Sequence, residues 1–306
     1  MNERRRNRPP VVVLTALDVE YDAVRDLLAD LRQPPPVSGT RFEIGAIGGG
    51  GEVVLALTGQ GNHASAVIAE RAIREFRPLA VFFVGVAGSL RPGLALGDVV
   101  VATHVYAYHG AAARADGLKS RPRVWEIDHG IDQAARQIAR RVERARNLRA
   151  GAQGPRVHFG PVASGEVLHD ARVSEPLRWI REHYDDAVAI EMEAAGVAKA
   201  GQLGAAPVAV IRAISDRADG TKSATDGRRW QARAVRNAAV FATALAADLI
   251  AHHPAGAEED EENPGAPGIH VETTGGSHGA VAGIINGGVS NGARPARADH
   301  EQGSWW

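Results

Sequence analysis

Two carboxylates stand in an otherwise apolar run, "VAIEMEAAG", where Glu191 and Glu193 flank Met192. A strand sends residues i and i+2 to the same side, so both acids would share a face if the segment is extended throughout. They would diverge if a helix begins at Glu193. A buried carboxylate without a partner is costly or takes up a proton. These acids therefore either interact with a helix N-terminus or lie at the mouth of a cleft that holds a ligand.

Similar polar groups follow other apolar runs of the chain. Each could simply cap a helix, because Asp, Ser and Glu favour the first helical turn. Ligands of parallel α/β sheets, however, bind at the carboxyl ends of the strands. Taken together, these residues predict one cleft rather than several separate caps. They are Asp18, Glu20, the glycine turn "GVAGS" (85–89), Ser164 to Glu166, Ser215 and Asp216.

Buried strands and helices are predicted to alternate between residues 11 and 252, because β-branched apolar runs alternate with stretches of helical periodicity. This pattern predicts an α/β fold, a single domain with a central mixed, mostly parallel twisted sheet covered by helices on both faces. Residues 106–128 are expected to be irregular. The expected strands are 11–17, 41–49, 52–61, 79–88, 97–103, 157–168, 187–192 and 207–216. The expected helices are 18–32, 62–76, 130–148, a short one before 187, 193–202 and 226–252.

The ends of the chain differ from this domain in composition. Residues 1–10 are basic, residues 253–268 contain the acidic block "AEEDEE", and residues 269–306 are rich in glycine. Charge-dense ends are typical of solvated, disordered segments. The stretch 269–295 also loosely resembles amyloid-type signalling motifs, because short β-branched islands of low charge can stack as cross-β structure. The tail is therefore interpreted either as disordered or as amyloid-motif-like.

Composition argues against several classes of protein. A net charge of −1 argues against nucleic acid as the main partner, and the absence of cysteine excludes disulfides and thiolate metal sites. No run approaches the ~18 apolar residues of a membrane span, and the basic N-terminus lacks the apolar segment of a signal peptide. We expect a cytoplasmic protein without a membrane or nucleic-acid partner, and without a metal or cofactor.

Five segments in order resemble the purine/uridine phosphorylase superfamily, and most of all its 5′-methylthioadenosine/S-adenosylhomocysteine nucleosidase branch. They are "TALDVEYDAVRDLL", "GVAGSLRPGLALGDVVVA", "ASGEVL", "AIEMEAAGVA" and "VIRAISDRAD". The resemblance covers residues 11–252 and implies that this stretch is a nucleosidase- or phosphorylase-like catalytic domain. It implies cleavage of the N-glycosidic bond of an adenosine derivative with release of adenine.

The resemblance also implies roles for the residues that match the family's motifs. Asp216 falls on the general acid that protonates the purine N7, and Glu20 falls on the acid that activates the attacking water. Cleavage through an oxocarbenium-like sugar requires both functions. Glu193 would hold the ribose hydroxyls and Met192 would pack against the sugar, which leaves Glu191 as a structural partner.

Further residues would shape the cleft. Arg212 and Ser215 would support the acid and the cleft. Leu168 stands where the family has a purine-stacking aromatic ring, which implies looser packing of the base. Val86 stands where the methylthioadenosine enzymes have a serine.

The chemistry of the nucleophile is predicted from the N-terminal turn. Phosphorylases need a cationic pocket for phosphate, whereas the turn "TALDVEYD" is acidic and would repel it. Hydrolysis is therefore favoured over phosphorolysis. The alternative enzyme is a phosphate-dependent purine nucleoside phosphorylase, and the alternative of another class is a non-catalytic nucleotide-sensing module that signals through its tail.

The substrate prediction rests on cations in the stretch 106–128. In this superfamily the stretch should cover the 5′ side of the sugar, and here it carries Lys119, Arg121 and Arg123. A methylthio group is apolar, whereas a triphosphate pairs with several cations. The expected substrate is therefore an adenine nucleotide such as ATP, or else methylthioadenosine or S-adenosylhomocysteine. A solvated basic loop is the alternative interpretation of these residues.

The resemblance extends to biological context. Nucleosidase domains of this superfamily also occur as effectors in immune-type systems, which suggests a role in antiviral defence. Members usually form homodimers or hexamers, so we expect a homo-oligomer, a dimer or higher. Residues 269–295 are the segment expected to mediate any self-association or contact with a partner protein.

Overall fold

The computed structural model describes residues 8–48, 50–115, 117–148, 154–167, 174–218 and 227–253. The predictions for residues 1–7, for Leu168, for nearly all of the linker 253–268 and for the tail 269–306 lie outside the described residues.

The secondary structure follows the predicted alternation of strands and helices. The strands are β1 (Val11–Thr15), β2 (Ala29–Arg32), β3 (Glu43–Ile47), β4 (Gly51–Leu57), β5 (Ala80–Ser89), β6 (Val99–Ala107), β7 (Ala111–Arg114), β8 (Gly117–Ser120), β9 (Arg123–Glu126), β10 (Val157–Ser164), β11 (Ala189–Glu191) and β12 (Val208–Asp216). The helices are α1 (Asp18–Arg25), α2 (Asn62–Phe76), α3 (His129–Leu148), α4 (Glu175–His183), α5 (Ala194–Leu203) and α6 (Gly227–His252).

Most of the described strands form one sheet in the order β11-β10-β6-β12-β5-β1-β4-β3-β2, and β9 pairs with β6. The long central pairings, β12 with β5 and β10 with β6, are parallel, as are both pairings of β1. Antiparallel pairings join β2, β3 and β4 at one edge. A short antiparallel contact of β11 with β5 closes the path through β12, β6 and β10 on itself. The predicted mixed, mostly parallel sheet is confirmed.

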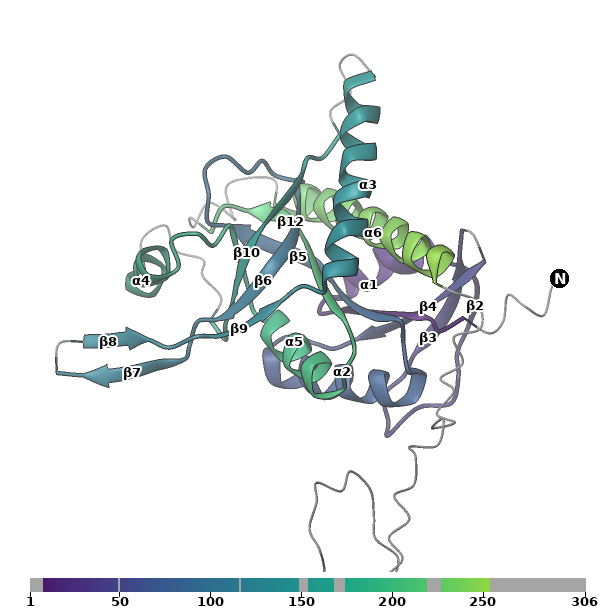
Figure 1. The fold of residues 1–306 in the computed structure, drawn as a ribbon, viewed down its shortest axis with the longest axis horizontal. Coiled ribbons are helices and arrows are strands. Elements are labelled where there is room, and N and C mark those ends of the chain that lie inside the picture. Colours follow the sequence, from purple (N-terminus) through teal and green to yellow (C-terminus); the bar gives the residue numbers. More distant parts are fainter. Residues whose placement is uncertain are drawn as a thin grey trace, which may run out of the picture. The chain divides into compact units, whose positions relative to one another are not determined.

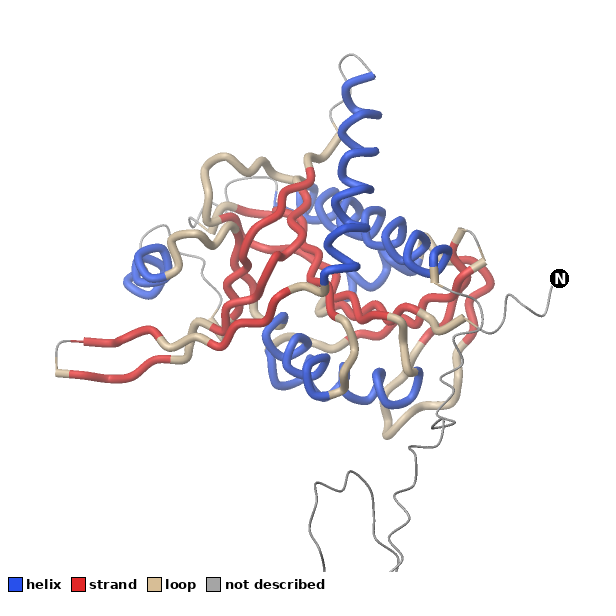
Figure 2. The backbone as a smooth tube through the Cα atoms, viewed as in Figure 1, coloured by secondary structure: helices blue, strands red, loops and turns tan. Residues whose placement is uncertain are grey.

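Helices cover both faces of this sheet (Figures 1 and 2). On one face, α1, α3 and α6 pack against side chains such as Val13 and Phe82. On the other face, α2 and α5 pack against the neighbouring residues Val12 and Phe83. Successive strand residues point to opposite faces, so a strand buried on both sides must be apolar throughout. The uninterrupted apolar runs of the sequence follow from this arrangement.

Local sequence signals determine where α2 ends and where α4 begins. Helix α2 ends where Arg77 adopts a left-handed φ of 41°, directly before Pro78. The helical conformation is disfavoured for a residue that precedes proline, so α2 ends abruptly here. Helix α4 begins after Ser174, whose Oγ accepts a hydrogen bond from the N–H of Leu177 at 3.2 Å.

The structure corrects two predictions about secondary structure. Helix α1 ends at Arg25 rather than at residue 32, because Ala29–Arg32 forms the edge strand β2 and Asp30 has a positive φ of 51°. The stretch 106–128 is not irregular: β7 and β8 form a separate hairpin and β9 pairs with β6. The hairpin strands are rich in alanine and glycine and lack the alternation that would have predicted them.

Helix α6 is long and apolar enough over residues Trp230–His252 to cross a membrane, by length and composition only. Half of its most apolar stretch is buried inside the protein, where α6 packs against β12, β5 and α1. Such burial is typical of a helix that packs on a sheet in the core of a protein.

Candidate active site

Glu20 lies in the first turn of α1, and only 2% of the residue is exposed. Its Oε2 accepts hydrogen bonds from the N–H of Ala16 (2.9 Å) and Leu17 (3.0 Å), and its Oε1 accepts one from the N–H of Val86 (2.9 Å). Burial raises the pKa of Glu20, although Arg212 and these N–H donors oppose the shift. Glu20 therefore caps α1 and also reaches the end of β5. A buried carboxyl with a raised pKa is suited to accept a proton from water.

Gly85 in β5 makes room for this arrangement. A Cβ at this position would lie 2.3 Å from both Glu20 Oε1 and Arg212 Nη1. Real Cβ atoms do not approach other atoms so closely, so the acid and the guanidinium occupy the space that a side chain would fill. The first glycine of "GVAGS" is therefore part of the site through what it lacks.

Arg212 of β12 is fully buried and joins the carboxylates of "VAIEMEAAG". Its Nη2 forms ion pairs with Glu191 Oε2 and with Glu193 Oε2, the latter at 3.7 Å. Its guanidinium carbon lies 3.9 Å from the centroid of the Phe83 ring. Both acids therefore turn toward one cation instead of diverging.

Glu191 and Glu193 are both buried but have different hydrogen-bond partners. Helix α5 begins at Ala194, and Glu191 accepts hydrogen bonds from the N–H of Glu193 (3.1 Å) and of Ala194 (2.9 Å). Glu193 Oε1 accepts one from the N–H of Gly61 at 3.2 Å. Burial, followed by the negative charge of Glu191, raises the pKa of Glu193 to about 7. Glu191 thus caps the helix, and Glu193 is the carboxyl with spare capacity for ligand hydroxyls.

Asp216 ends β12 and lies beside β5. Its Oδ1 accepts a hydrogen bond from the N–H of Ala218 and its Oδ2 accepts one from Ser215 Oγ, both at 2.9 Å. A Cβ on Gly88 would lie 2.9 Å from Asp216 Oδ1. Because Gly88 and Val86 belong to the same strand, Asp216 and Glu20 meet the same strand end two residues apart. The structure therefore brings the two predicted catalytic acids to one edge of the sheet.

Asn62, the first residue of α2, links this helix to β10 and to α5 through hydrogen bonds. Its Oδ1 accepts hydrogen bonds from Ser164 Oγ (3.1 Å) and from the N–H of Gly196 (2.9 Å). Its Nδ2 donates to the carbonyl oxygen of Gly165 and to Glu166 Oε1, both at 2.8 Å. Neither Asn62 nor Gly61 was predicted as a site residue. The only signal for them is a glycine turn followed by a helix start.

Of the remaining predicted residues, Met192 and Val86 lie beside the carboxylates, whereas the three cations do not. Met192 is half-buried between the two acids, and Val86 contributes its backbone N–H rather than its side chain. Lys119, Arg121 and Arg123 are exposed. Lys119 lies on the β7–β8 hairpin, and Arg121 and Arg123 follow the hairpin in the sequence. The hairpin projects from the sheet (Figure 1). Their predicted contact with the 5′ side of a substrate stays a prediction, as does the role of Leu168.

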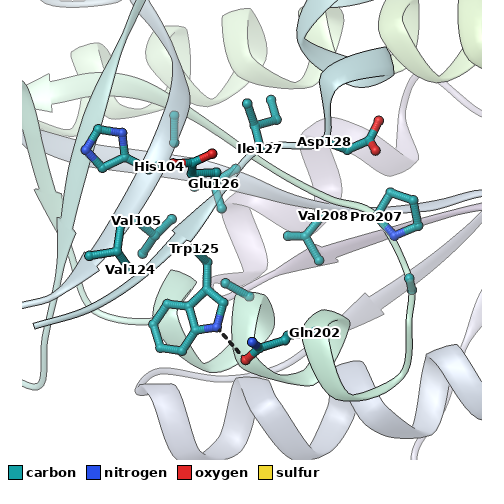
Figure 3. A pocket seen from close by; sticks show the side chains of 14 residues that line it. His104, Val105, Val124, Trp125, Glu126, Ile127, Asp128, Gln202, Pro207 and Val208 are labelled. Atoms are coloured by element: carbon teal, nitrogen blue, oxygen red, sulfur yellow. Dashed lines mark hydrogen bonds between the residues drawn. The ribbon is translucent and has the colours of Figure 1, made fainter.

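A separate cavity of about 330 Å³ lies between β6, β9 and α5 (Figure 3). Trp125 closes one side, and its Nε1 donates a hydrogen bond to Gln202 Oε1 at 3.0 Å. The cavity is lined at β12 by Val208 and Val210, near the start of that strand. Asp216 ends the same strand, so this cavity is distinct from the carboxylate cluster. Among the residues that the structure describes, no group of His, Asp or Glu side chains is arranged to hold a metal ion.

Known proteins are similar to this chain in sequence and in fold. Residues 10–249 match the phosphorylase superfamily. The chain is 31% identical over 213 residues to the 5′-methylthioadenosine/S-adenosylhomocysteine nucleosidase of Actinobacillus succinogenes, a match that covers 68% of this chain and 86% of that protein. It is 32% identical over 241 residues to the ATP nucleosidase Cap17 of Escherichia coli, covering 70% of this chain and 47% of the relative. The chain thus spans about half the length of that relative.

The structure is also similar to a solved one, that of 5′-methylthioadenosine/S-adenosylhomocysteine nucleosidase from Neisseria meningitidis in complex with methylthio-immucillin-A. The TM-score is 0.66 and the identity 28%, with 78% of this chain and 99% of that chain covered. Fold and comparisons together define an α/β protein of the nucleoside phosphorylase-like class. The chain belongs to the phosphorylase superfamily.

Proposed function

We propose that the chain is an N-glycosidase that hydrolyses an adenosine derivative and releases adenine. The single observation that carries the proposal is the placement of Glu20, Glu193 and Asp216 near the carboxyl-terminal part of β5 and its neighbours. The similarity to a methylthioadenosine/S-adenosylhomocysteine nucleosidase and to an ATP nucleosidase supports it. The proposed substrates are accordingly an adenine nucleotide such as ATP, or methylthioadenosine or S-adenosylhomocysteine.

In the proposed mechanism, three residues act on the N-glycosidic bond. Asp216 gives a proton to the purine, and the electron pair of the broken bond goes to the leaving base. Glu193 holds the ribose hydroxyls while the sugar develops oxocarbenium character. Water forms the new bond to the anomeric carbon and its proton goes to Glu20. The sugar product therefore carries a hydroxyl, and Asp216 is reprotonated before the next turnover.

Water is proposed as the nucleophile because Glu20 and its neighbours disfavour an anion. Arg212 is the cation that lowers the pKa of Glu20. It is already engaged by Glu191 and Glu193. An incoming phosphate would meet carboxylates rather than a free guanidinium, and like charges at short range repel.

The substitution Asp216→Asn tests the function. We expect free adenine, detected by chromatography, to form ~10²–10⁴-fold more slowly from whichever substrate the wild type cleaves, since one general acid is typically worth that factor. Ser215→Ala serves as a milder comparison, because it removes one hydrogen bond to the acid. An unchanged rate in Asp216→Asn, with circular dichroism showing an intact fold, would contradict the assignment. A wild-type protein that releases no base from methylthioadenosine, S-adenosylhomocysteine, AMP or ATP would contradict the function itself.

A further inference from the structure

A groove of about 510 Å³ lies across the carboxyl end of β4. It runs between α1 and α2, and the turn 37–40 with Arg41 forms its outer wall. Its size falls within the range of roughly 300–1,000 Å³ that is usual for small-molecule sites. The residues that matter for its chemistry are Tyr21, Thr40, Arg41 and Arg71.

The groove lies beside the carboxylate cluster, at the same edge of the sheet. Leu57, which lines it, is the last residue of β4 and the register partner of Thr15, the last residue of β1. Tyr21, which also lines it, directly follows Glu20 in α1. The edge where parallel strands end is the usual place for ligands of such sheets.

The two arginines of the groove differ from three other arginines of this part of the chain, Arg25, Arg32 and Arg74, which each form an ion pair with a glutamate. Arg41 and Arg71 have no carboxylate within 4.0 Å in the part of the chain that the structure describes. The described residues that line the groove include no acidic residue. The groove therefore carries positive charge that the described protein does not neutralise.

Glu43, two residues after Arg41, already has partners of its own. It accepts hydrogen bonds from Arg25 Nε (2.7 Å) and Gln33 Nε2 (2.8 Å). Burial, together with a hydrogen bond to the same carboxylate, raises the pKa of Tyr21. Tyr21 therefore stays protonated and neutral, so it does not offset the positive charge of the groove.

The groove is also held in a fixed shape. Arg71 Nη1 donates a hydrogen bond to Thr40 Oγ1 at 2.7 Å, which orients the guanidinium. Val37 and Thr40 exchange two backbone hydrogen bonds of 2.9 and 2.8 Å across the turn. Ser38 and Gly39 between them have φ values of 47° and 81°, which makes the turn tight. Hydroxyls and a preoriented guanidinium are groups that bind phosphate oxygens well.

We propose that this groove binds phosphoryl groups, with Arg41 and Arg71 as its cations. The phosphates come either from the 5′ chain of the nucleotide being cleaved or from a separate polyphosphate. The first source rests on the proposed function, whereas the binding of polyphosphate does not.

Isothermal titration calorimetry with inorganic tripolyphosphate tests whether the groove binds phosphoryl groups. The double variant Arg41→Gln and Arg71→Gln keeps length and polarity but removes both charges, and we expect it to bind at least ~10-fold more weakly than the wild type. The matched control is Arg74→Gln with Arg77→Gln, which removes two exposed cations near the end of α2 that do not line the groove. A further variant, Lys119→Ala with Arg121→Ala, removes hairpin cations that the sequence predicts to pair with phosphates, so it tests the competing location of the site. We expect the matched control to bind as the wild type does.

Phosphate binding in the groove is refuted if the wild type does not bind tripolyphosphate, or if the groove variant binds as tightly as its matched control. It is also refuted if the hairpin variant alone loses binding. Equal melting temperatures of all variants would show that the losses are not due to unfolding.

Cleavage kinetics then identify the source of the phosphates. If they belong to the substrate, the groove variant raises KM for ATP about 10-fold or more and leaves KM for methylthioadenosine unchanged. If they belong to a separate ligand, both KM values stay unchanged while tripolyphosphate binding is lost. If neither nucleoside nor nucleotide is cleaved, the proposed function fails, and the titration still decides whether the groove binds phosphate.

Discussion

Arg212 faces three carboxylates, those of Glu20, Glu191 and Glu193, in a part of the protein closed to solvent. One guanidinium cannot fully compensate three negative charges in a medium of low dielectric. The consequence is seen at Glu193, where burial and the charge of Glu191 raise the pKa to about 7. The site therefore holds a proton near neutral pH even without a ligand.

The raised pKa of Glu193 predicts how stability depends on pH. Folding raises this pKa from its ordinary value of 4.5 to about 7, so between these values the folded chain holds a proton that the unfolded chain has lost. The free energy of unfolding should therefore fall as pH rises from about 4.5 to about 7, by up to ~3 kcal/mol. Urea unfolding of Glu193→Gln at pH 5 and pH 8 should lack this contribution. Glu182→Gln, an exposed residue of α4, is the control. A wild type whose stability relative to Glu193→Gln is the same at both pH values would contradict the shift.

The close approach of Glu20 and Arg212 to Gly85 predicts that a side chain at this position impairs both stability and base release. In Gly85→Ala the new methyl group would meet Glu20 Oε1 and Arg212 Nη1 at 2.3 Å, so both groups must move. Overpacking of this kind typically costs ~1–3 kcal/mol of stability. We expect a loss of base release larger than the loss of stability explains, because the displaced carboxylate is the proposed base. The matched control is Gly93→Ala, where a Cβ would meet no atom within 4 Å. Equal rates in the two variants would refute the role of Gly85.

At the scale of elements, Asn62 holds α2, β10 and α5 together. Removing its amide in Asn62→Ala leaves the N–H of Gly196 and the hydroxyl of Ser164 without this acceptor, at a cost of roughly 1–3 kcal/mol. Because Gly61, one residue earlier, donates to Glu193, the ribose-binding carboxyl should lose its orientation as well. We expect KM to rise more than kcat falls.

Steady-state kinetics check the Asn62 prediction. Asn62→Asp is the informative partner variant, since it keeps an acceptor for Gly196 and Ser164 but removes the donor to Gly165. It should fall between the wild type and Asn62→Ala. Wild-type KM in Asn62→Ala would show that the link between these elements does not position the site.

Elements of the fold differ in how far the sequence predicts them. The strand Val11–Thr15 is apolar throughout because it is buried on both faces, so its pattern is unambiguous. The boundary after α1 was misplaced because Ala29–Arg32 continues the helical composition, and only pairing with β3 makes it a strand. The hairpin β7–β8 was missed for the same reason, since its pairing is its only signal.

The site shows the same division. Glu20, Glu193 and Asp216 were predicted because polar groups after several strands were expected to converge at one end of the sheet, and because all three match motifs of the family that the sequence resembles. Gly61 was not predicted, because it acts through a backbone N–H. The glycine turn that begins at Gly85 was predicted to lie at the cleft, but the close approach of Glu20 and Arg212 that requires a glycine there was not. Asn62 resembled an ordinary first residue of a helix. Such contributions become visible only when distant segments are placed side by side.

At the scale of the whole molecule, charge separates into two neighbouring regions at one edge of the sheet. Glu20, Glu191 and Glu193 gather around Arg212, while Arg41 and Arg71 line the groove across β4 without a described carboxylate partner. If both proposals hold, a phosphate-bearing substrate is attracted by the second region and cleaved at the first. The expected homo-oligomer would place copies of both regions in one particle, and its assembly state stays a prediction.

This separation predicts how inorganic phosphate affects the reaction. A phosphorylase would accelerate with phosphate and produce ribose 1-phosphate, because phosphate is its nucleophile. Here phosphate should be repelled from the carboxylates around Glu20 and attracted to Arg41 and Arg71, so we expect no acceleration of adenine release and no ribose 1-phosphate. In water enriched in ¹⁸O, the label should appear in the sugar product. Chloride at the same ionic strength is the control, since it screens charges without offering phosphate oxygens. A rate that rises with phosphate concentration, with ribose 1-phosphate as the product, would overturn hydrolysis and make the chain a phosphorylase.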